Sequence, residues 1–300
     1  MRVHLVDGTY ELFRAHFSHR PPKTVSLSGR PTDVKATTGL VAAMLSLLHD
    51  PDEAVTHHAI AFDNPIVSFR NELFEGYKTD EGVPPAILAQ FELAEIAMRA
   101  LGIVVWSMDR WEADDALATA ATRFAPEVEQ VRILTPDKDL GQCVQGTRVV
   151  QVDRMRRKLI DEATVRAVRG VPPASIPDLL GLVGDTADGI PGLAGFGAKS
   201  AAAVLARWGT IERIPDDATA WDVKVTGAPR LAATLAAERQ DALLYKKLAT
   251  LVLDVPLRES LADLEFRGVP RASFDTLCTQ LDSRDLRSRP IRFASPPATG

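Results

Sequence analysis

The stretch 111–118 reads Trp-Glu-Ala-Asp-Asp-Ala-Leu-Ala and places three carboxylates within four positions, directly before an alanine-rich segment. On a helix, Glu112 and Asp115 share a face and Asp114 lies beside them. Like charges this close are costly unless a cation lies among them, and hard oxygen ligands of this kind suit Mg²⁺ or Mn²⁺. Taken alone, the stretch is explained equally well as a solvated helix start, because acidic residues favour a helix N-terminus.

Acidic groups recur along the chain, each close behind an apolar run. Because the carboxyl ends of parallel strands meet at one edge of a sheet, the groups that follow predicted strands can gather there. The last group follows a helical segment and has to fold back over that edge. Nine carboxylates exceed the needs of one divalent ion, so the pattern predicts two or more Mg²⁺ or Mn²⁺ ions, the arrangement used for phosphoryl transfer. The nine candidate ligands are Asp7, Asp63, Glu112, Asp114, Asp115, Asp137, Asp139, Asp185 and Asp188.

Short apolar runs alternate with helical patterns over the first half of the chain. This alternation predicts an α/β fold with a mainly parallel sheet that helices cover on both faces. Residues 19–35 are basic and rich in turn-forming residues, and we expect a surface loop there. The predicted strands are residues 2–8, 54–62, 103–108, 131–135 and 148–152, and the clearest predicted helices are residues 37–48, residues 86–101 and a helix that ends near residue 124.

From about residue 172 the chain changes to helices and glycine-rich turns. The turn Gly195-Phe196-Gly197, followed by Lys199, leads into a further helix. Backbone N–H groups at such a helix N-terminus form a seat for phosphate. The spacing is not that of a Walker loop, and a tight helical hairpin without a ligand is the competing interpretation.

Composition limits the classes of protein to which the chain can belong. Its 300 residues suit one large domain or two modest ones, and the net charge is −5. If nine of the 40 acids bind metal, 31 acids remain against 35 bases, which fits a basic groove around an acidic centre. Cys143 and Cys278 fit no zinc spacing and indicate a reducing, intracellular setting. We find no signal-peptide pattern and no apolar run of membrane-spanning length, so we expect a cytoplasmic protein without a membrane partner.

Taken together, these motifs resemble the 5′-nuclease family, which comprises the 5′-3′ exonuclease domain of bacterial DNA polymerase I, phage 5′ nucleases and flap endonucleases. The likeness covers roughly residues 3–265 and keeps the motifs in order. It is carried by Leu5-Val6-Asp7-Gly8 with Phe13-Arg14; Phe62-Asp63 with Ser68-Phe69-Arg70 and Tyr77-Lys78; Glu112-Ala113-Asp114-Asp115; Thr135-Pro136-Asp137-Lys138-Asp139-Leu140; and Gly184-Asp185 through Asp188 to Ile190-Pro191-Gly192, followed by Gly195-Phe196-Gly197.

The resemblance implies a PIN-like α/β nuclease core in residues 1–170, an all-α helix-3-turn-helix DNA-binding module in residues 171–265, and a C-terminal helix and loose tail in residues 266–300. It implies Mg²⁺- or Mn²⁺-dependent cleavage of DNA at a 5′ flap, nick or end in replication and repair, with RNA–DNA hybrids at primers as further substrates. A bacterial, nucleoid-associated monomer fits this activity.

The resemblance also assigns roles to individual residues. The acidic residues become direct or water-mediated metal ligands, with Asp115 part of the same cluster, and three cations hold the scissile phosphate. The turn from residue 193 to 200 grips the duplex backbone around a K⁺ ion. The three cations are Arg14, Arg70 and Lys78, and the candidate DNA-binding residues are Leu193, Gly195, Gly197, Lys199 and Ser200.

The chain departs from the family pattern just after the Tyr-Lys pair. The family usually has an Arg three residues after this Lys, whereas this chain has Glu81, preceded by Asp80. The stretch would form the arch over the active site, where acidic side chains repel phosphate, so the change favours trimming of duplex ends and nicks over threading of flaps. Two other interpretations stay open at this point: a DNA-binding relative without catalysis, and a PIN-type ribonuclease.

Overall fold

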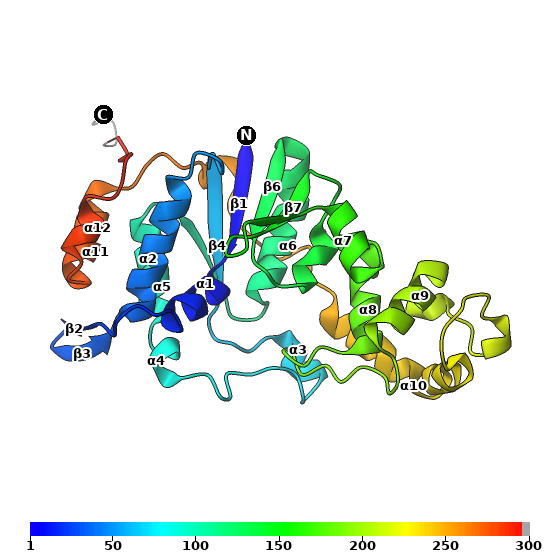
Figure 1. Ribbon diagram of the computed structural model, residues 1–300. Coiled ribbons are helices and arrows are strands. Elements are labelled where there is room, and N and C mark those ends of the chain that lie inside the picture. The colour runs from blue at the N-terminus through cyan, green and yellow to red at the C-terminus, as the bar shows by residue number, and fades with distance from the viewer. Residues whose placement is uncertain (296–300) are drawn as a thin grey trace.

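The computed structural model describes residues 1–295, and its centre is a six-stranded sheet with strand order β5-β4-β1-β6-β7-β8 (Figure 1). Five strands are parallel and β8 pairs with β7 in the antiparallel direction. This confirms the mainly parallel sheet and the five predicted strands, while the short β8 was not predicted. The strands are β1 (Arg2–Asp7), β4 (His57–Asp63), β5 (Val104–Met108), β6 (Gln130–Leu134), β7 (Val149–Asp153) and β8 (Lys158–Ile160).

Helices cover both faces of this sheet, as a buried parallel sheet requires. Neighbouring residues of a strand point to opposite faces. Leu5 therefore packs in the layer with α6 (Ala113–Phe124), and Val6 packs in the layer with the other helices. That second layer holds α1 (Gly8–His16), α2 (Lys35–Leu48), α5 (Phe91–Ala100), α11 (Arg271–Gln280) and α12 (Arg284–Arg287).

Two local predictions were wrong. The expected surface loop contains a hairpin of β2 (Thr24–Leu27) and β3 (Arg30–Asp33), because Ser28 and Gly29 both adopt the positive φ that a tight hairpin turn needs. The expected helix 86–101 is divided into α4 (Pro85–Leu88) and α5. The buried Gln90 lies at the break, where its Oε1 accepts a 3.0 Å hydrogen bond from the backbone N–H of Thr37 on α2.

The second half of the chain forms a helical module beside the sheet, with a hydrophobic core of its own. Beyond residue 249 the chain returns to the sheet, because Leu251 and Val255 pack in the layer with α6. The helices of the module are α7 (Glu162–Arg169), α8 (Ile176–Val183), α9 (Ala198–Trp208) and α10 (Ala228–Ala249). Short 3₁₀ helices occur at Ala125–Glu127, Asp139–Cys143, Pro173–Ser175, Ile211–Arg213, Ala218–Ala220 and Leu261–Leu264.

The termini add little to the architecture of the site. The N-terminus lies at the edge of the sheet opposite to the ends of the parallel strands (Figure 1). Helices α11 and α12 place Phe274 and Leu286 against the α5 side of the core. Of the predicted loose tail, residues 296–300 lie outside the described residues. Over residues 1–295, no helix has both the length and the apolar character needed to cross a bilayer.

Candidate metal centre

Asp7 opens the site at the carboxyl end of the central strand β1. It is the N-cap of α1, and its Oδ1 accepts a 2.8 Å hydrogen bond from the backbone N–H of Tyr10. Its Oδ2 accepts a 2.9 Å hydrogen bond from the Thr135 hydroxyl, which follows the neighbouring strand β6. The carboxylate is therefore fixed by two elements that meet at one edge of the sheet.

Two further carboxylates meet Asp7 from the neighbouring strand and from α6. Asp63 is the last residue of β4, and its Oδ1 accepts a 2.7 Å hydrogen bond from the backbone N–H of Ala113 at the first turn of α6. Asp114, one residue further along α6, is half-buried. Repulsion from Asp7, Asp63 and Asp137 raises the pKa of Asp114 together with the larger effect of desolvation, so these four carboxylates share one region.

Glu112 is the N-cap of α6 and is held on both carboxylate oxygens. Its Oε1 accepts a 2.9 Å hydrogen bond from the Ser68 hydroxyl, and its Oε2 accepts a 3.1 Å hydrogen bond from the Tyr77 hydroxyl. The Lys78 ammonium lies 3.4 Å from the same Oε2. The negative charge of the buried Glu112 is thus compensated by two hydroxyl donors and by the Lys78 ammonium.

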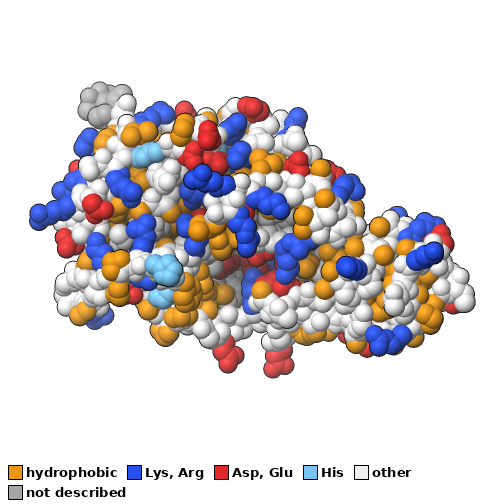
Figure 2. Space-filling model, in the orientation of Figure 1, with side chains coloured by type: hydrophobic (Ala, Val, Ile, Leu, Met, Phe, Trp, Pro, Cys, Tyr) orange, Lys and Arg blue, Asp and Glu red, His pale blue; other side chains and the backbone are white. Residues whose placement is uncertain are grey.

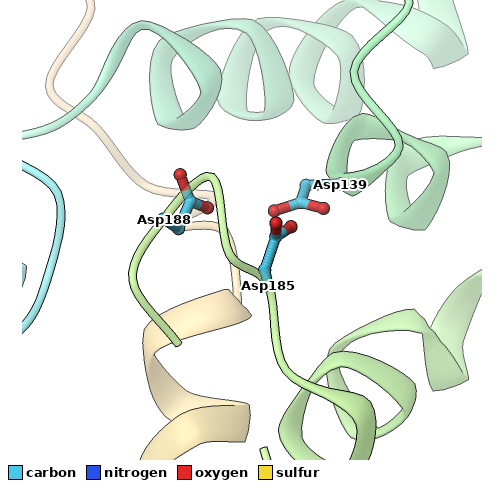
Figure 3. Close-up of side chains that lie close together, drawn as sticks. All are labelled: Asp139, Asp185 and Asp188. Atoms are coloured by element: carbon cyan, nitrogen blue, oxygen red, sulfur yellow. The ribbon is translucent and has the colours of Figure 1, made fainter. Parts of the chain in front are cut away.

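A second group of carboxylates lies beside the first and includes the turn after α8. One oxygen each of Asp139, Asp185 and Asp188 can be chosen so that all lie within 4.8 Å of one another (Figure 3). Asp139 comes from the loop after β6, where its backbone N–H donates a 2.8 Å hydrogen bond to Asp137 Oδ1. The predicted folding back of the turn that holds Asp185 and Asp188 over the sheet edge is therefore seen in the structure.

Burial and mutual repulsion make these carboxylates costly to ionise together. Desolvation is the main cause that raises the pKa of Asp7 to about 7, and the charges of Asp63 and Asp137 add to it. Desolvation and the charges of Asp137, Asp188 and Asp185 likewise raise the pKa of Asp139. Groups with such raised pKa values gather at functional sites.

The donors fit a hard divalent cation. Every candidate donor is a carboxylate oxygen, which Mg²⁺ and Mn²⁺ prefer over nitrogen or sulfur. Asp139 Oδ1 is buried and has no hydrogen-bond partner among the described residues, although a buried acceptor normally has one. Asp137 repels both Asp114 and Asp139, so it lies between the two carboxylate groups. We refer to the whole arrangement as the two-lobed centre. Its first lobe is Asp7, Asp63, Glu112 and Asp114, and its second lobe is Asp139, Asp185 and Asp188.

Of the three predicted phosphate-binding cations, Lys78 lies at the centre. Its ammonium is 3.0 Å from Asp188 and 3.4 Å from Glu112, and its side chain keeps 28% of its surface exposed. It therefore bridges the two lobes and still faces the opening. The surrounding negative charges of Glu112 and Asp188 raise its pKa despite desolvation, so it stays positively charged.

The structure gives Arg70 and Asp115 a different role from the predicted one. Both are buried, with 1% and 0% of their surfaces exposed, and Arg70 donates two parallel hydrogen bonds of 2.7 and 2.8 Å to Asp115. Asp115 also accepts bonds from the backbone N–H groups of Glu112 and Val252. Asp115 is therefore saturated and Arg70 is out of reach of a phosphate, so both position the centre.

Arg14 lies away from the carboxylates, in the last turn of α1. It lies seven positions after Asp7, which is about 10 Å along a helix. Its guanidinium pairs with the buried Glu11, which also contacts Arg154 3.5 Å away. The pocket of about 440 Å³ that Arg14 lines holds acidic as well as basic residues and none of the nine predicted metal ligands, so Arg14 lies away from the place of the scissile phosphate.

Most of the residues predicted to bind the DNA backbone, in the glycine turn before α9, are accessible at the surface. Leu193 is the exception. Gly195, Gly197 and Lys199 are exposed, and the Ser200 hydroxyl accepts a 3.0 Å hydrogen bond from the backbone N–H of Gly197. Leu193 was predicted to bind DNA, but its side chain is buried in the core of the helical module. It therefore shapes the turn from inside.

Several side chains of the site were not singled out as functional from the sequence. Ser68 and Tyr77 hold Glu112, Thr135 holds Asp7, and Lys138 pairs with Asp185. All four stand inside the motifs that carried the resemblance, beside the acids and bases that were chosen. A hydroxyl within two residues of a candidate ligand or phosphate-binding cation is the signal that could have identified Ser68, Tyr77 and Thr135.

Comparison with known families covers almost the whole chain. The family model described as the 5′-3′ exonuclease N-terminal resolvase-like domain matches residues 2–170, and the one described as the 5′-3′ exonuclease C-terminal SAM fold matches residues 171–272. The DNA polymerase I of Bacillus caldotenax is 34% identical over 281 residues, which are 92% of this chain and 31% of that protein. The chain thus spans about a third of that relative.

A relative of similar length and two solved structures extend the likeness. The 5′-3′ exonuclease of Aquifex aeolicus is 29% identical over 95% of this chain and 93% of that protein. The T5 5′-exonuclease with bound zinc has a TM-score of 0.66 at 16% identity, over 94% of this chain and 98% of the other. A bacteriophage T5 flap endonuclease in a pseudo-enzyme-product complex with DNA and metal ions has a TM-score of 0.64 at 17% identity, over 96% and 99%. These two structures confirm the fold.

Proposed function

This chain belongs to the 5′-3′ exonuclease family, and we propose that it is a divalent-metal-dependent 5′ nuclease that hydrolyses DNA phosphodiesters near 5′ ends, flaps or nicks. The two-lobed centre is the observation that carries the proposal. It gathers buried carboxylates around one cation, Lys78, whose side chain stays partly exposed. Two Mg²⁺ or Mn²⁺ ions bound there would supply an activated water and would neutralise charge on the phosphate undergoing attack.

Each lobe provides ligands for one ion in this proposal. Asp139, Asp185 and Asp188 hold one ion, since their oxygens already converge. Asp7, Asp63 and Asp114 would hold the other ion, and Asp137 would be available to both groups of ligands. Glu112 serves through a water ligand or a direct contact, in the orientation that Ser68 and Tyr77 impose. The nine predicted ligands thus become eight, because Asp115 is engaged by Arg70.

Lys78 holds the scissile phosphate in the proposed complex. An ammonium that bridges the lobes can move its N–H donors from Asp188 to a phosphate oxygen without leaving the centre. Compensation of the phosphate charge by a fixed cation stabilises the transition state more than the ground state, because negative charge accumulates on the phosphate as the water attacks. Arg14 acts further along the strand, beyond the reacting phosphate.

The helical module holds the duplex away from the centre. The exposed residues of the turn before α9 present backbone N–H groups and the Lys199 ammonium to one strand, and the turn would also hold a K⁺ ion. Such contacts recognise the shape and charge of DNA and do not depend on its sequence. We propose a monomer, with a nuclease core in residues 1–170 and a DNA-binding module in residues 171–265, that acts on nucleoid DNA in the bacterial cytoplasm, including RNA–DNA hybrids.

A cleavage assay tests the proposal. Duplexes labelled at the 5′ end and carrying a nick or a blunt end are incubated with the wild-type protein in Mg²⁺, in Mn²⁺ and in EDTA, beside Asp114→Ala. We expect products near the 5′ end with either metal, none with EDTA, and a loss of roughly a thousandfold or more in Asp114→Ala, since the variant lacks a ligand of one ion. DNA binding without cleavage in both metals would instead identify a non-catalytic DNA-binding protein.

A second substrate set distinguishes DNA from RNA as the main substrate. The same nicked duplex is prepared with a DNA or an RNA 5′ segment on a DNA template. The helical module grips the duplex, so we expect both substrates to be cut and single-stranded RNA of the same sequence to be left intact. Rapid cleavage of single-stranded RNA with intact DNA would indicate a PIN-type ribonuclease.

A further inference from the structure

The segment between α3 (Phe69–Leu73) and α4 runs past the two-lobed centre. We call residues 74–84 the strap. In Figure 1 the strap follows the lower edge of the molecule and passes beside the loop that precedes α9. Because Tyr77 and Lys78 belong to the strap and reach Glu112, the strap lies directly at the mouth of the centre.

The strap is fastened to the turn that supplies two metal-binding aspartates. The backbone N–H of Lys78 donates a 3.0 Å hydrogen bond to the carbonyl of Asp188. Gly189 adopts a φ of +73° and approaches the Gly76 carbonyl so closely that any side chain at position 189 would clash with it. The buried Tyr77 side chain packs into the core of the helical module. The strap therefore closes against the module on one side of the centre.

The outer surface of the strap is acidic. Lys78 is the only base between Arg70 and Arg99, and its side chain points inward to Glu112 and Asp188. Glu75, Asp80 and Glu81 are all exposed. Within residues 1–295, none of these three has an ion-pair partner within 4.0 Å. Acidic side chains project from the lower edge of the molecule in Figure 2, along which the strap runs in Figure 1.

The charges at the centre and on the strap act in opposite ways on the phosphates of a 5′ strand. A phosphate at the centre meets Lys78 and the bound ions. The phosphates of a longer 5′ single strand would have to pass the acidic strap, where Glu75, Asp80 and Glu81 would repel any phosphate that comes within the Debye length of about 8 Å. Rejection by like charge is a recognised route to specificity.

Resting on the proposed nuclease function, we propose that the strap is a specificity element that excludes long 5′ single strands. The substrate class is then duplex DNA whose 5′ end lies at a nick, a gap or a blunt end, with one or a few unpaired nucleotides entering the centre. Products are mononucleotides and short oligonucleotides. The residues that determine this selection are Asp80 and Glu81, because both are exposed and neither holds any part of the centre.

The test compares a nicked duplex with a matched duplex that carries a 5′ flap of 20 nucleotides, both labelled at the 5′ end. The variant Asp80→Lys/Glu81→Arg reverses the charge of the strap. Glu127→Arg is the control for charge reversal away from the strap: Glu127 is also exposed but lies before β6, at the opposite edge of the sheet, and its reversal changes the net charge by half as much as the strap variant does. The readout is the ratio of flap cleavage to nick cleavage, measured as kcat/KM in Mg²⁺ with at least four salt concentrations.

We expect wild type and Glu127→Arg to cut the nick and to cut the flap poorly. The strap variant should raise the ratio of flap to nick cleavage by roughly tenfold or more, and this gain should shrink as salt increases. Equal ratios in all three proteins, or a wild-type ratio near one, would overturn the inference. The nicked duplex should be cut whether or not the strap selects against flaps. If the nuclease proposal itself is wrong, wild type cuts neither substrate, so the two failures can be told apart.

Discussion

Arg70 and Asp115 form a bidentate pair with both side chains buried, at N–O distances of 2.7 and 2.8 Å. The pair joins three parts of the chain that meet at the metal centre. Arg70 precedes the strap and also donates to the carbonyls of Leu248, in the last turn of α10, and of Thr250, directly after that helix. Asp115 accepts from the backbone N–H of Glu112 at the start of α6. The pair therefore fixes the helix start that carries two of the proposed metal ligands.

Replacing only one residue of this pair should both destabilise the protein and weaken its metal site. In Arg70→Met, Asp115 stays buried without its cation, which should lower the free energy of unfolding by about 3–5 kcal/mol. Urea unfolding measures this loss. The double variant Arg70→Met/Asp115→Leu removes the unpaired charge and should recover part of the stability without recovering activity. Full activity in the double variant would contradict the positioning role.

Removing one carboxylate from the crowded centre should stabilise the metal-free protein. Burial and neighbouring charges raise the pKa of Asp139, so its ionised form is strained at neutral pH when no cation is present. We expect Asp139→Asn to raise the melting temperature in EDTA and to abolish the further rise that Mn²⁺ produces in wild type. Differential scanning calorimetry with and without Mn²⁺ checks both effects. An unchanged response to Mn²⁺ would exclude Asp139 as a ligand.

His58 should make the fold sensitive to acid. It is fully buried, and desolvation, followed by the charges of His4 and His57, lowers its pKa from 6.5 to about 3. The unfolded chain therefore binds a proton below pH 6.5 that the folded chain refuses until about pH 3. This contribution to stability is complete above pH 6.5 and is lost as pH falls, by about 3 kcal/mol at pH 4.

The comparison with His58→Leu isolates this contribution. Urea unfolding is measured for both proteins from pH 7 to pH 4, with EDTA throughout. The difference in unfolding free energy between wild type and variant should change with pH in favour of the variant. A constant difference would show that His58 takes up its proton equally in the folded and the unfolded chain. The core partner Phe266, whose ring lies 5.2 Å from His58, stays in place in both proteins.

Lys199 should contribute to duplex binding without affecting chemistry. Its side chain is exposed at the start of α9, and it takes no part in the metal centre. Lys199→Ala should weaken binding uniformly across DNA sequences and should reduce the slope of log affinity against log salt by about one. Fluorescence anisotropy in Ca²⁺ measures the affinity, and single-turnover cleavage at saturating protein should stay unchanged. A lower single-turnover rate would place Lys199 nearer to the reaction.

Much of the fold could be predicted because local signals and the global sheet agree. Strand runs that end in an acid, such as the one that ends at Asp7, place the carboxylates at one edge by topology alone. The hairpin β2–β3 escaped prediction because its apolar alternation is limited to Val25 and Leu27, within a segment that is otherwise basic and contains prolines. The break at Gln90 depends on a hydrogen bond to Thr37 on α2, and such a tertiary contact leaves no local pattern.

The site was harder to predict in detail because composition does not distinguish a ligand from a support. Asp114 and Asp115 are adjacent and chemically identical, yet one lies among the other carboxylates and the other faces Arg70. Which of them faces inward depends on where α6 begins and on how it packs. The same holds for Arg70 and Lys78, since only the structure shows that one is buried and the other bridges the lobes.

The most direct measurement is the position of Mn²⁺ in crystals of the wild-type protein, located by its anomalous scattering. The account predicts two peaks: one among Asp139, Asp185 and Asp188, and one beside Asp7, Asp63 and Asp114. In Asp188→Asn the first peak should be lost, together with cleavage of a nicked duplex. A protein that cleaves DNA with no Mn²⁺ peak in either lobe would contradict the account.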